Sequence, residues 1–552
     1  DLPSSTFNWV GFDGSKIACC RAYNSYESHR GEADEKIKGW MELNRGKKVG
    51  MVLWGIGDHG GGPSRIDLQK IEELKKSEKE FNLIHSTPEA FFDELQTSGE
   101  AIPDYSGLMN PRYTGCYTSM MRTKKIHRTL ENELYMTEKM SAPALMAGVS
   151  DYPSEEIEKA TKDLLLVEFH DILPGSAIEP VGEYAQAVAG HGLTELRPEK
   201  IKAFLALCSD KAKAEEGTIP VFVYNPHPYE VDETVEVEFQ LPDQNKNPAL
   251  YSVPHVYYMG KEIPCQREHE ISNFNVDWRI KTVFFAKLPA GTMSRFDIKM
   301  ELCENPEPPV QPEGDELVWN NGKMRVVINL HTGLIDSYEA DGKTGLGKES
   351  LKPLAIKDDE NSWAHKEKSF RTVKGEFTLM DEEKAAEFSG IINGSRPRSV
   401  RIIEDGAVRT VVEALFSYHD SFLARRYYLP KNSSEFTVKD KVYWNEKMTM
   451  LKLSLNTVDG DTFIGQTAYG SETLLTNGDE MVSQKWNLVS DGKTALTVIN
   501  SSTYGSDYKD GELRITCLRS PGYAAGKSDF SVRKPYIMEQ DRFSPFMDQG
   551  EH

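Results

Sequence analysis

The spacing of apolar and polar residues predicts an α/β arrangement in the first hundred residues. Residues 33–45 are polar and helical in pattern, and further helices are expected at 66–80, where apolar residues recur at helical intervals, and at 89–97. Short apolar runs predict strands at 7–10, 15–20, 48–54 and 81–85, and the first two flank a turn at Asp13-Gly14 that favours a hairpin. Strands that alternate with helices are typical of a parallel sheet, so we predict an α/β domain over residues 1–100.

The next hundred residues have helical periodicity throughout. Ile126, Leu130 and Leu134 repeat every fourth position, with charged residues between them. We expect helices at 117–146, 154–176, 179–191 and 197–214, the second of which ends at Pro174-Gly175. Residues 101–216 are therefore predicted to form a three-helix-type bundle domain.

After Gly217 the apolar period changes from helical to alternating. Strands are expected at 219–224, 278–288, 324–330, 399–403, 409–418, 434–444, 451–455, 495–499 and 513–519. Repeated short strands bounded by turns are typical of β-sandwiches. The Pro- and Glu-rich segment 304–314 reads as a linker, which divides a small β-sandwich (217–303) from a large one (315–552).

Candidate chemistry begins in the glycine-rich stretch 54-WGIGDHGGGPSR-65. Asp58 and His59 are the titratable residues inside this loop. An aspartic acid in a weakly polar loop has a raised pKa, which suits proton donation to a leaving group. Asp58 is thus a candidate general acid, His59 is the alternative acid, and a plain turn in which Asp58 binds backbone amides remains open. The Lys-Ser/Thr pair of a phosphate-binding Walker loop is absent.

A second candidate, His170-Asp171, lies at the expected end of the second helix of the bundle. The imidazole is either a metal ligand beside a carboxylate or a helix-terminal cation that favours the dipole. A catalytic zinc needs about three protein ligands, and the chain has no HxH, HxD or HExxH motif to supply them. A basic group on the first bundle helix (Arg122, Lys124, Lys125 and Arg128) is expected to be a solvated face paired with acidic neighbours.

Composition narrows the classes of partner. The chain has 552 residues and a formal net charge of -21, which disfavours nucleic acid and anionic membranes. No signal peptide and no apolar run of membrane-spanning length is visible. Seven cysteines without a CxxC motif indicate neither a disulfide framework nor a zinc finger, so a cytoplasmic setting is favoured.

Together, these stretches resemble glycoside hydrolase family 38, the zinc-dependent retaining α-mannosidases, in its bacterial and cytosolic branch. The resemblance rests on four segments: 1-DLPSSTFNWVGFDGSKI-17, the loop at 54–65, 113-YTGCYTSMMRTKKIHRTLENEL-134 and 168-EFHDILPGS-176. It implies that residues 1–100 are the C-terminal part of the catalytic α/β domain. We therefore expect the chain to be part of a longer polypeptide, whose earlier segment holds the nucleophile and the other zinc ligands.

The resemblance also implies roles for individual residues. Asp58 matches the best candidate for the general acid/base, with His59 beside it at the substrate, His170 matches a ligand of one Zn²⁺ ion, and Asp171 matches a position that contacts the sugar. Asp13 lies in a turn and is no nucleophile. The implied function is release of α-linked mannose from oligosaccharides by a cytoplasmic enzyme, and large cytosolic members suggest a homodimer. A mannosylglycerate-type hydrolase and a non-catalytic carbohydrate-binding fragment remain alternatives.

Overall fold

The computed structural model describes residues 2–57, 60–107, 109, 113–272, 276–358, 361–390, 397–524 and 545–552. The chain divides into two compact units, Asp1–Pro111 and Arg112–His552, which are described separately below. Asp58 and His59 lie outside the described residues.

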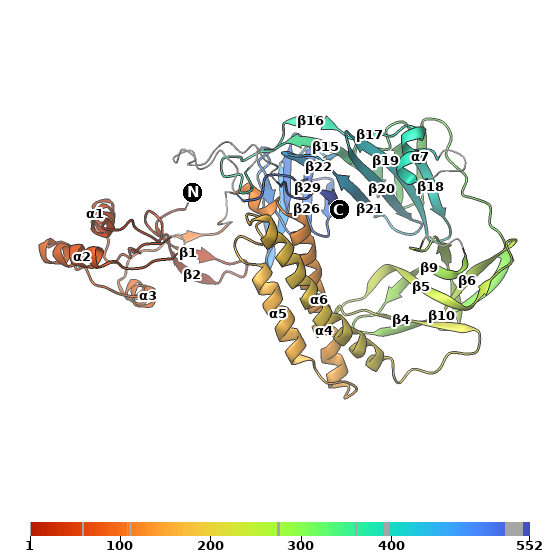
Figure 1. Cartoon of the computed structure of the whole chain (residues 1–552), viewed down its shortest axis with the longest axis horizontal. Helices are drawn as coiled ribbons and strands as arrows, with labels where there is room; N and C mark the ends of the chain where they lie inside the picture. Colours follow the sequence, from red (N-terminus) through yellow and green to blue (C-terminus); the bar gives the residue numbers. More distant parts are fainter. Residues whose placement is uncertain are drawn as a thin grey trace. The chain divides into compact units, whose positions relative to one another are not determined.

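The first unit packs three helices beside a small sheet (Figure 1). Its elements are β1 (Thr6–Val10), β2 (Lys16–Cys20), α1 (Ala33–Leu43), α2 (Arg65–Ser77), α3 (Pro88–Thr97) and β3 (Asp104–Tyr105). The predicted hairpin is present as the antiparallel pair β1–β2, and β3 adds in parallel to β1. Thr87 caps α3 as its sequence predicts, because its hydroxyl accepts a hydrogen bond from the Ala90 amide at 3.4 Å.

The strands predicted at 48–54 and 81–85 are wrong for the described residues, in which neither segment pairs in a sheet. Their apolar side chains are buried all the same. Val52 and Trp54 from the first segment, and Phe81 and Leu83 from the second, pack on the cluster that joins α1 to α2. Apolar periodicity reports this burial, whereas a strand also requires a hydrogen-bonding partner along its edge.

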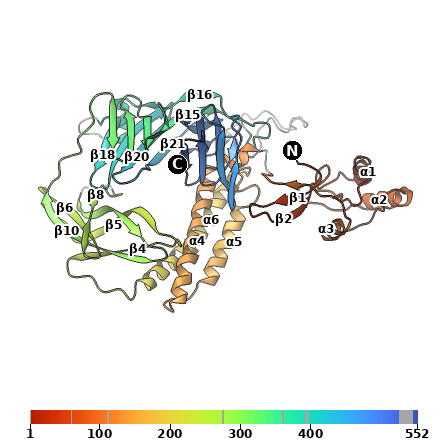
Figure 2. The same cartoon turned by 180° about the vertical axis from the view of Figure 1, so that it is seen from behind.

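The second unit begins with the predicted helical bundle. It contains the 3₁₀ turn η1 (Thr114–Tyr117) and the helices α4 (Met121–Met146), α5 (Ser154–Val167) and α6 (Glu179–Leu207). The three helices lie side by side in both views (Figures 1 and 2). Leu130 of α4, Leu164 of α5 and Leu196 of α6 meet in one apolar cluster. This is the packing that the four-residue repeat predicts.

Two helix boundaries differ from the prediction. The segments predicted at 179–191 and 197–214 are joined in one continuous helix, α6, which ends at Leu207. Gly192 in this helix packs closely against α4: a Cβ there would lie 2.9 Å from a methyl carbon of Leu130. The glycine is thus a packing position, and the helix continues through it. Helix α5 ends at Val167, because the following residues form successive turns that lead to Gly175 at φ +79°, a conformation outside an α-helix.

The small β-sandwich follows the bundle. One sheet has the order β4-β10-β6-β7 and the other β5-β9-β8. Their bounds are β4 (Thr218–Tyr224), β5 (Val231–Asn245), β6 (Leu250–Tyr258), β7 (Lys261–Ile263), β8 (Cys265–Glu268), β9 (Asp277–Leu288) and β10 (Met293–Glu304). Phe284 of one sheet and Phe296 of the other share one apolar core, with ring centroids 4.7 Å apart.

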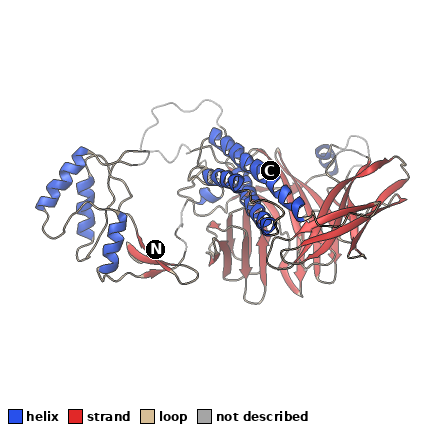
Figure 3. Ribbon diagram, turned by 90° about the horizontal axis from the view of Figure 1, so that it is seen from below, coloured by secondary structure: helices blue, strands red, loops and turns tan. Residues whose placement is uncertain are grey.

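The rest of the chain is almost entirely β-structure (Figure 3). The described residues of this part form four sheets, with the orders β11-β12-β13-β14, β16-β15-β22-β29-β28-β25, β17-β19-β20-β21-β30 and β24-β23-β26-β27. The strands are β11 (Glu316–Asn320), β12 (Met324–Asn329), β13 (Ile335–Ala340), β14 (Lys343–Leu346), β15 (Lys352–Lys357), β16 (Val373–Glu376), β17 (Thr378–Leu379), β18 (Val400–Asp405), β19 (Arg409–Tyr418), β20 (Ser421–Pro430), β21 (Thr437–Trp444), β22 (Thr449–Asn456), β23 (Thr462–Thr467), β24 (Gly470–Thr473), β25 (Met481–Val482), β26 (Trp486–Ser490), β27 (Ala495–Ile499), β28 (Gly505–Lys509), β29 (Glu512–Arg519) and β30 (Gly550–Glu551). A short helix, α7 (Glu382–Ser389), follows β17, and β18 pairs with β19.

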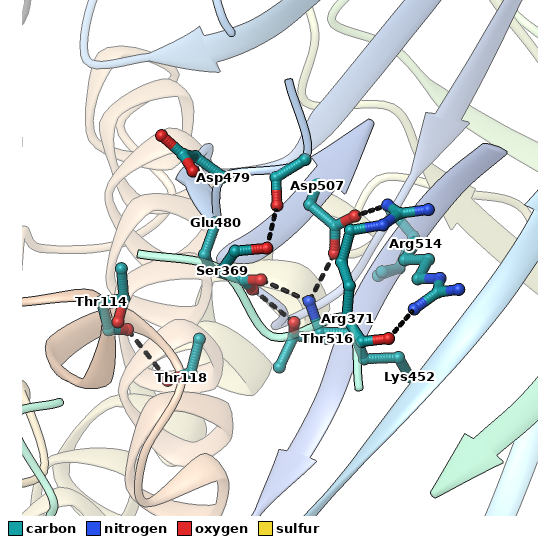
Figure 4. A network of polar contacts seen from close by, with 12 residues as sticks. Thr114, Thr118, Ser369, Arg371, Lys452, Asp479, Glu480, Asp507, Arg514 and Thr516 are labelled. Atoms are coloured by element: carbon teal, nitrogen blue, oxygen red, sulfur yellow. Dashed lines mark hydrogen bonds and ion pairs between the residues drawn. The ribbon is translucent and has the colours of Figure 1, made fainter. Parts of the chain in front are cut away.

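A buried ionic network lies among the strands β22, β28 and β29 of the second of these sheets (Figure 4). The fully buried Lys452 ammonium binds Glu480 and lies 2.6 Å from Asp507, and Arg371 binds Asp507 from the other side. Glu480 also accepts a hydrogen bond from Thr516 at 2.5 Å. Because opposite charges face one another, the network satisfies groups that would be costly to bury alone.

Candidate active site

The glycine-rich loop of the first unit is a closed turn on a rigid base. The Ile56 amide donates to the Gly62 carbonyl at 2.9 Å, so these two residues lie side by side at the base of the loop. Gly61 has φ +144°, and a Cβ there would lie 2.4 Å from the Ile56 carbonyl oxygen. Glycine is required at this position because the two arms of the loop approach so closely. The predicted Asp58 and His59 lie between Ile56 and Gly62 in the sequence and outside the described residues.

Asp67 fixes the base of the loop, a role that sequence reasoning missed. Its carboxylate is fully buried and accepts hydrogen bonds from Gly31 and Ala33 at the start of α1, at 2.9 and 3.1 Å. It also binds the hydroxyl of Ser64, which in turn caps α2. Burial alone would raise the Asp67 pKa, but these hydrogen bonds outweigh it and lower the pKa. Ser64 three residues before Asp67 was a visible helix-cap signal in the sequence.

His170 and Asp171 lie on the turn after α5. Side-chain exposure is 77% for His170 and 43% for Asp171, and the imidazole Nε2 lies 3.3 Å from Asp171 Oδ2. The other oxygen of Asp171 accepts a hydrogen bond from Ser176 at 2.8 Å. The pair is therefore accessible to a ligand, and Ser176 holds the carboxylate in place.

Helix α4 is bound to the turn that carries His170 and Asp171. The Lys124 ammonium donates to the carbonyl oxygens of Ser119 and Leu173 at 2.6 and 2.7 Å. Gly175 lies against Ser119, since a Cβ at Gly175 would approach the Ser119 backbone carbon to 2.9 Å. The entry to α4 and the His170 turn are thus locked together by one cation and one close backbone contact.

The predicted solvated basic face of α4 is wrong at two of its four positions. Lys124 and Arg128 have only 2% and 4% of their surfaces exposed. Arg128 pairs with Glu131 at 3.2 Å and lies over the Tyr504 ring, 4.9 Å from its centroid. Burial lowers the pKa of Lys124 to about 8, although the nearby Asp548 carboxylate acts in the opposite direction. The sequence showed charges at helical spacing, and only the packing decides which face is covered.

The last residues of the chain complete the entry to α4. Asp548 Oδ2 accepts a hydrogen bond from the Met121 amide at 2.8 Å, across 427 positions of sequence. A carboxylate at this place satisfies a free amide and complements the positive end of the helix dipole. Arg519, fully buried, donates to the Ser119 hydroxyl at 2.9 Å and so supports the same segment from β29.

The described residues only partly fit a zinc site. His170 and Asp171 are suitable donors, but no third His, Cys, Asp or Glu joins them in the described part of the chain. A catalytic zinc requires about three protein ligands. We therefore assign no chemical step to a metal. Asp58 lies outside the described residues, so its predicted role and that of His170 stay predictions.

Sequence models of three domains from one family match the chain in order. The N-terminal domain of glycosyl hydrolases family 38 matches residues 1–108, the α-mannosidase middle domain matches 112–199, and the family 38 C-terminal domain matches 319–527. The chain belongs to glycosyl hydrolase family 38. The resemblance of the sequence motifs to this family is confirmed.

Curated relatives of this family 38 chain are α-mannosidases. An α-mannosidase of Saccharomyces cerevisiae is 32% identical over 232 residues, and human α-mannosidase 2C1 is 29% identical over 266 residues. These matches cover 39% and 47% of this chain but only 21% and 24% of the relatives, so the chain matches about a quarter of their length or less.

Solved structures of the family share the fold. An α-mannosidase from Enterococcus faecalis V583 superposes with a TM-score of 0.71 at 15% identity, over 99% of this chain and 68% of that one. A second family 38 protein from Enterococcus faecalis gives 0.69 at 14%, over 95% and 66%. The multidomain α and β fold class is confirmed by this likeness. In the described part of the chain, no helix is long and apolar enough to span a membrane, and all seven cysteines are free thiols.

Proposed function

We propose that this family 38 chain is part of a retaining α-mannosidase, which releases α-linked mannose from neutral oligosaccharides. The observation that carries the proposal is the ordered match of the three family domains, with the loop at 54–65 and the turn at 168–176 inside the first two. The net charge of -21 does not oppose a neutral substrate.

In the proposed reaction, a carboxylate outside the assigned residues attacks the anomeric carbon. Asp58 donates its proton to the departing glycosidic oxygen, and it then removes a proton from the water that hydrolyses the glycosyl-enzyme. Asp171 accepts a hydrogen bond from a sugar hydroxyl, a role supported by its 43% exposure and by the Ser176 hydrogen bond that orients it. His59 is the proposed neighbour of the substrate on the acid-bearing loop.

His170 is proposed as one ligand of a zinc ion. Its exposed imidazole beside the Asp171 carboxylate supports this role, because a ligating histidine is commonly oriented by a carboxylate. Zinc bound there would interact with sugar hydroxyls as a Lewis acid. The other zinc ligands are proposed to be residues other than His170 and Asp171.

The experiment is a comparison of three substrates with the natural full-length protein. We expect hydrolysis of aryl α-mannosides and α-mannobiose with retention of the anomeric configuration, and slower hydrolysis of mannosylglycerate. Faster turnover of mannosylglycerate would replace the proposed substrate, and binding without hydrolysis would support the carbohydrate-binding alternative.

Two variants test the assigned residues. Asp58→Asn should reduce turnover severely on α-mannobiose and less on aryl mannosides with good leaving groups, because only a poor leaving group needs the proton. Equal losses on both substrates would remove Asp58 from the acid role. His170→Ala should abolish stoichiometric zinc in metal analysis, and retained zinc would contradict its assignment. We further propose a cytoplasmic homodimer, which light scattering and cell fractionation would test.

A further inference from the structure

A wide bulge interrupts the pairing of β5 with β9 at one end of the small sandwich. Gln240 pairs with Arg279 and Asn245 pairs with Asp277, so the four residues 241–244 of β5 face the single residue Trp278 of β9. Bulges re-aim side chains and recur beside functional sites. Here the bulge brings a polar loop segment next to an aromatic ring.

The base of the bulge is rigid. Asp277 accepts hydrogen bonds from the Asn245 amide at 2.8 Å, from both the backbone amide and the hydroxyl of Ser252 at 3.0 and 2.8 Å, and from Arg267 at 2.6 Å. Burial would raise the Asp277 pKa, but these partners outweigh it and lower the pKa, so the carboxylate stays ionised and bound. Asp277, the residue before Trp278, is therefore held in a fixed position.

The Trp278 side chain is partly exposed, and a hydrogen bond fixes its orientation. The residue is 40% exposed, and its ring nitrogen donates to the Leu241 carbonyl at 2.9 Å. Because this polar edge of the ring already has a partner, the exposed part of the indole offers mainly apolar surface. A rigid aromatic ring loses little conformational entropy when a ligand packs on it.

The bulge and the ring line an open groove of about 500 Å³, formed by Pro242, Asp243, Gln244, Lys246 and Trp278. This volume lies in the range of small-molecule sites. The lining combines one aromatic ring with a carboxylate, an amide and an ammonium, which supply both hydrogen-bond acceptors and donors. Asp243 and Lys246 carry opposite charges, so the groove has no net charge with which to select an ion.

We propose that this groove binds a pyranose unit of a neutral oligosaccharide, at a subsite separate from the hydrolytic site. A pyranose ring has an apolar face of C–H groups and a rim of hydroxyls. The apolar face can pack on the Trp278 indole. The hydroxyls can form hydrogen bonds with Asp243, Gln244 and Lys246. The inference concerns binding alone and does not depend on the proposed hydrolysis.

The test is ligand-observed NMR with mannotriose, maltotriose and a galacturonate trimer, on the full-length protein in an Asp58→Asn background that does not consume the mannoside. Trp278→Ala should weaken binding of a neutral trisaccharide about tenfold, the loss expected for one aromatic contact. Asp243→Ala and Gln244→Ala, which leave the indole in place, should each weaken the same binding. Preference between mannotriose and maltotriose identifies the sugar.

Tyr469→Ala is the matched control, because Tyr469 is an aromatic residue fully exposed on the surface (103%) outside the groove. It should bind like the unsubstituted protein. Unchanged affinity in Trp278→Ala, equal affinity for the charged trimer, or no neutral trisaccharide bound would each overturn the proposal. Aryl mannoside hydrolysis is measured in parallel without the Asp58 substitution. Trisaccharide binding that persists without hydrolysis would contradict only the proposed function.

Discussion

The Lys124 ammonium lies 2.7 Å from the carbonyl oxygen of Leu173 and so binds helix α4 to the turn that bears His170 and Asp171. Lys124 also donates to Ser119, which adjoins η1 at the entry to the same helix. A buried cation that touches two backbone carbonyls positions neighbouring side chains without contacting a substrate. The geometry of the candidate site therefore depends on a residue outside both the loop at 54–65 and the turn at 168–176.

Replacing Lys124 with Met should lower kcat on α-mannosides by about tenfold or more, because the freed turn no longer holds His170 and Asp171 in one geometry. Steady-state kinetics of the full-length protein provide the measurement. Lys125→Met is the control, since Lys125 is the exposed neighbour on the same helix. If both variants had the same kcat as the unsubstituted protein, Lys124 would have no positioning role.

The pH dependence of stability should report the burial of Lys124. Its pKa is lowered from the ordinary lysine value of 10.5 to about 8 in the folded chain. The unfolded state then binds more protons between these two values, so this group alone makes the folded state more stable as pH rises from 8 towards 10.5, by at most about 1.4 kcal/mol per pH unit. Urea denaturation of the chain and of Lys124→Met, compared across this range, should show the slope only in the former. If the free energy of unfolding changed with pH in the same way in both proteins, the expected effect of Lys124 would be contradicted.

Gly175→Ala should destabilise the His170 turn. Alanine at φ +79° is strained by roughly 1–2 kcal/mol, and its Cβ would also approach the Ser119 backbone to 2.9 Å. Gly148→Ala isolates the strain, because Gly148 has a similar φ of +69° and nothing within 4 Å of its Cβ position. The loss in free energy of unfolding should be larger for Gly175→Ala, and equal losses would show that the contact with Ser119 is unimportant.

Asp548→Ala should destabilise the chain by about 0.5–2 kcal/mol, the usual cost of removing a helix-capping side chain. The Met121 amide would lose its acceptor, and the first turn of α4 would lose a favourable charge. Thermal unfolding measures the change. Asp510→Asn serves as the control, since the Asp510 side chain is 86% exposed. A cost no larger than that of the control would exclude the capping role.

Arg409→Ala should destabilise the contact between the small β-sandwich and the β-sheets that follow it by about 3–5 kcal/mol. Arg409 of β19 donates to both carboxylate oxygens of Glu268 in β8, at 2.7 and 2.6 Å, and Glu268 is only 4% exposed. Its removal leaves a buried carboxylate with fewer partners. Arg325→Ala breaks an exposed pair with Glu339 and should cost less than about 1 kcal/mol in the same denaturation assay. Similar losses would contradict this account.

Local patterns in the sequence predicted many of the elements. The strand expected at 409–418 is β19, Arg409–Tyr418, and the apolar repeat of Ile126, Leu130 and Leu134 marks the core side of α4. Apolar residues at alternating or helical spacing indicate that one face of a strand or helix is buried. The same logic misassigned 48–54, which is buried but unpaired within the described residues, because pairing depends on a distant edge.

The sequence by itself determined the family, through the loop at 54–65 and the turn at 168–176, because short motifs preserve the residue types that chemistry needs. Tertiary structure alone decided what supports the His170 turn. Lys124 looked like one of four surface cations, and Asp548 was 427 positions from the amide that it caps. Local sequence holds no record of such partners, since the free energy of a buried charge or a capped helix depends on groups that meet only after the chain has folded.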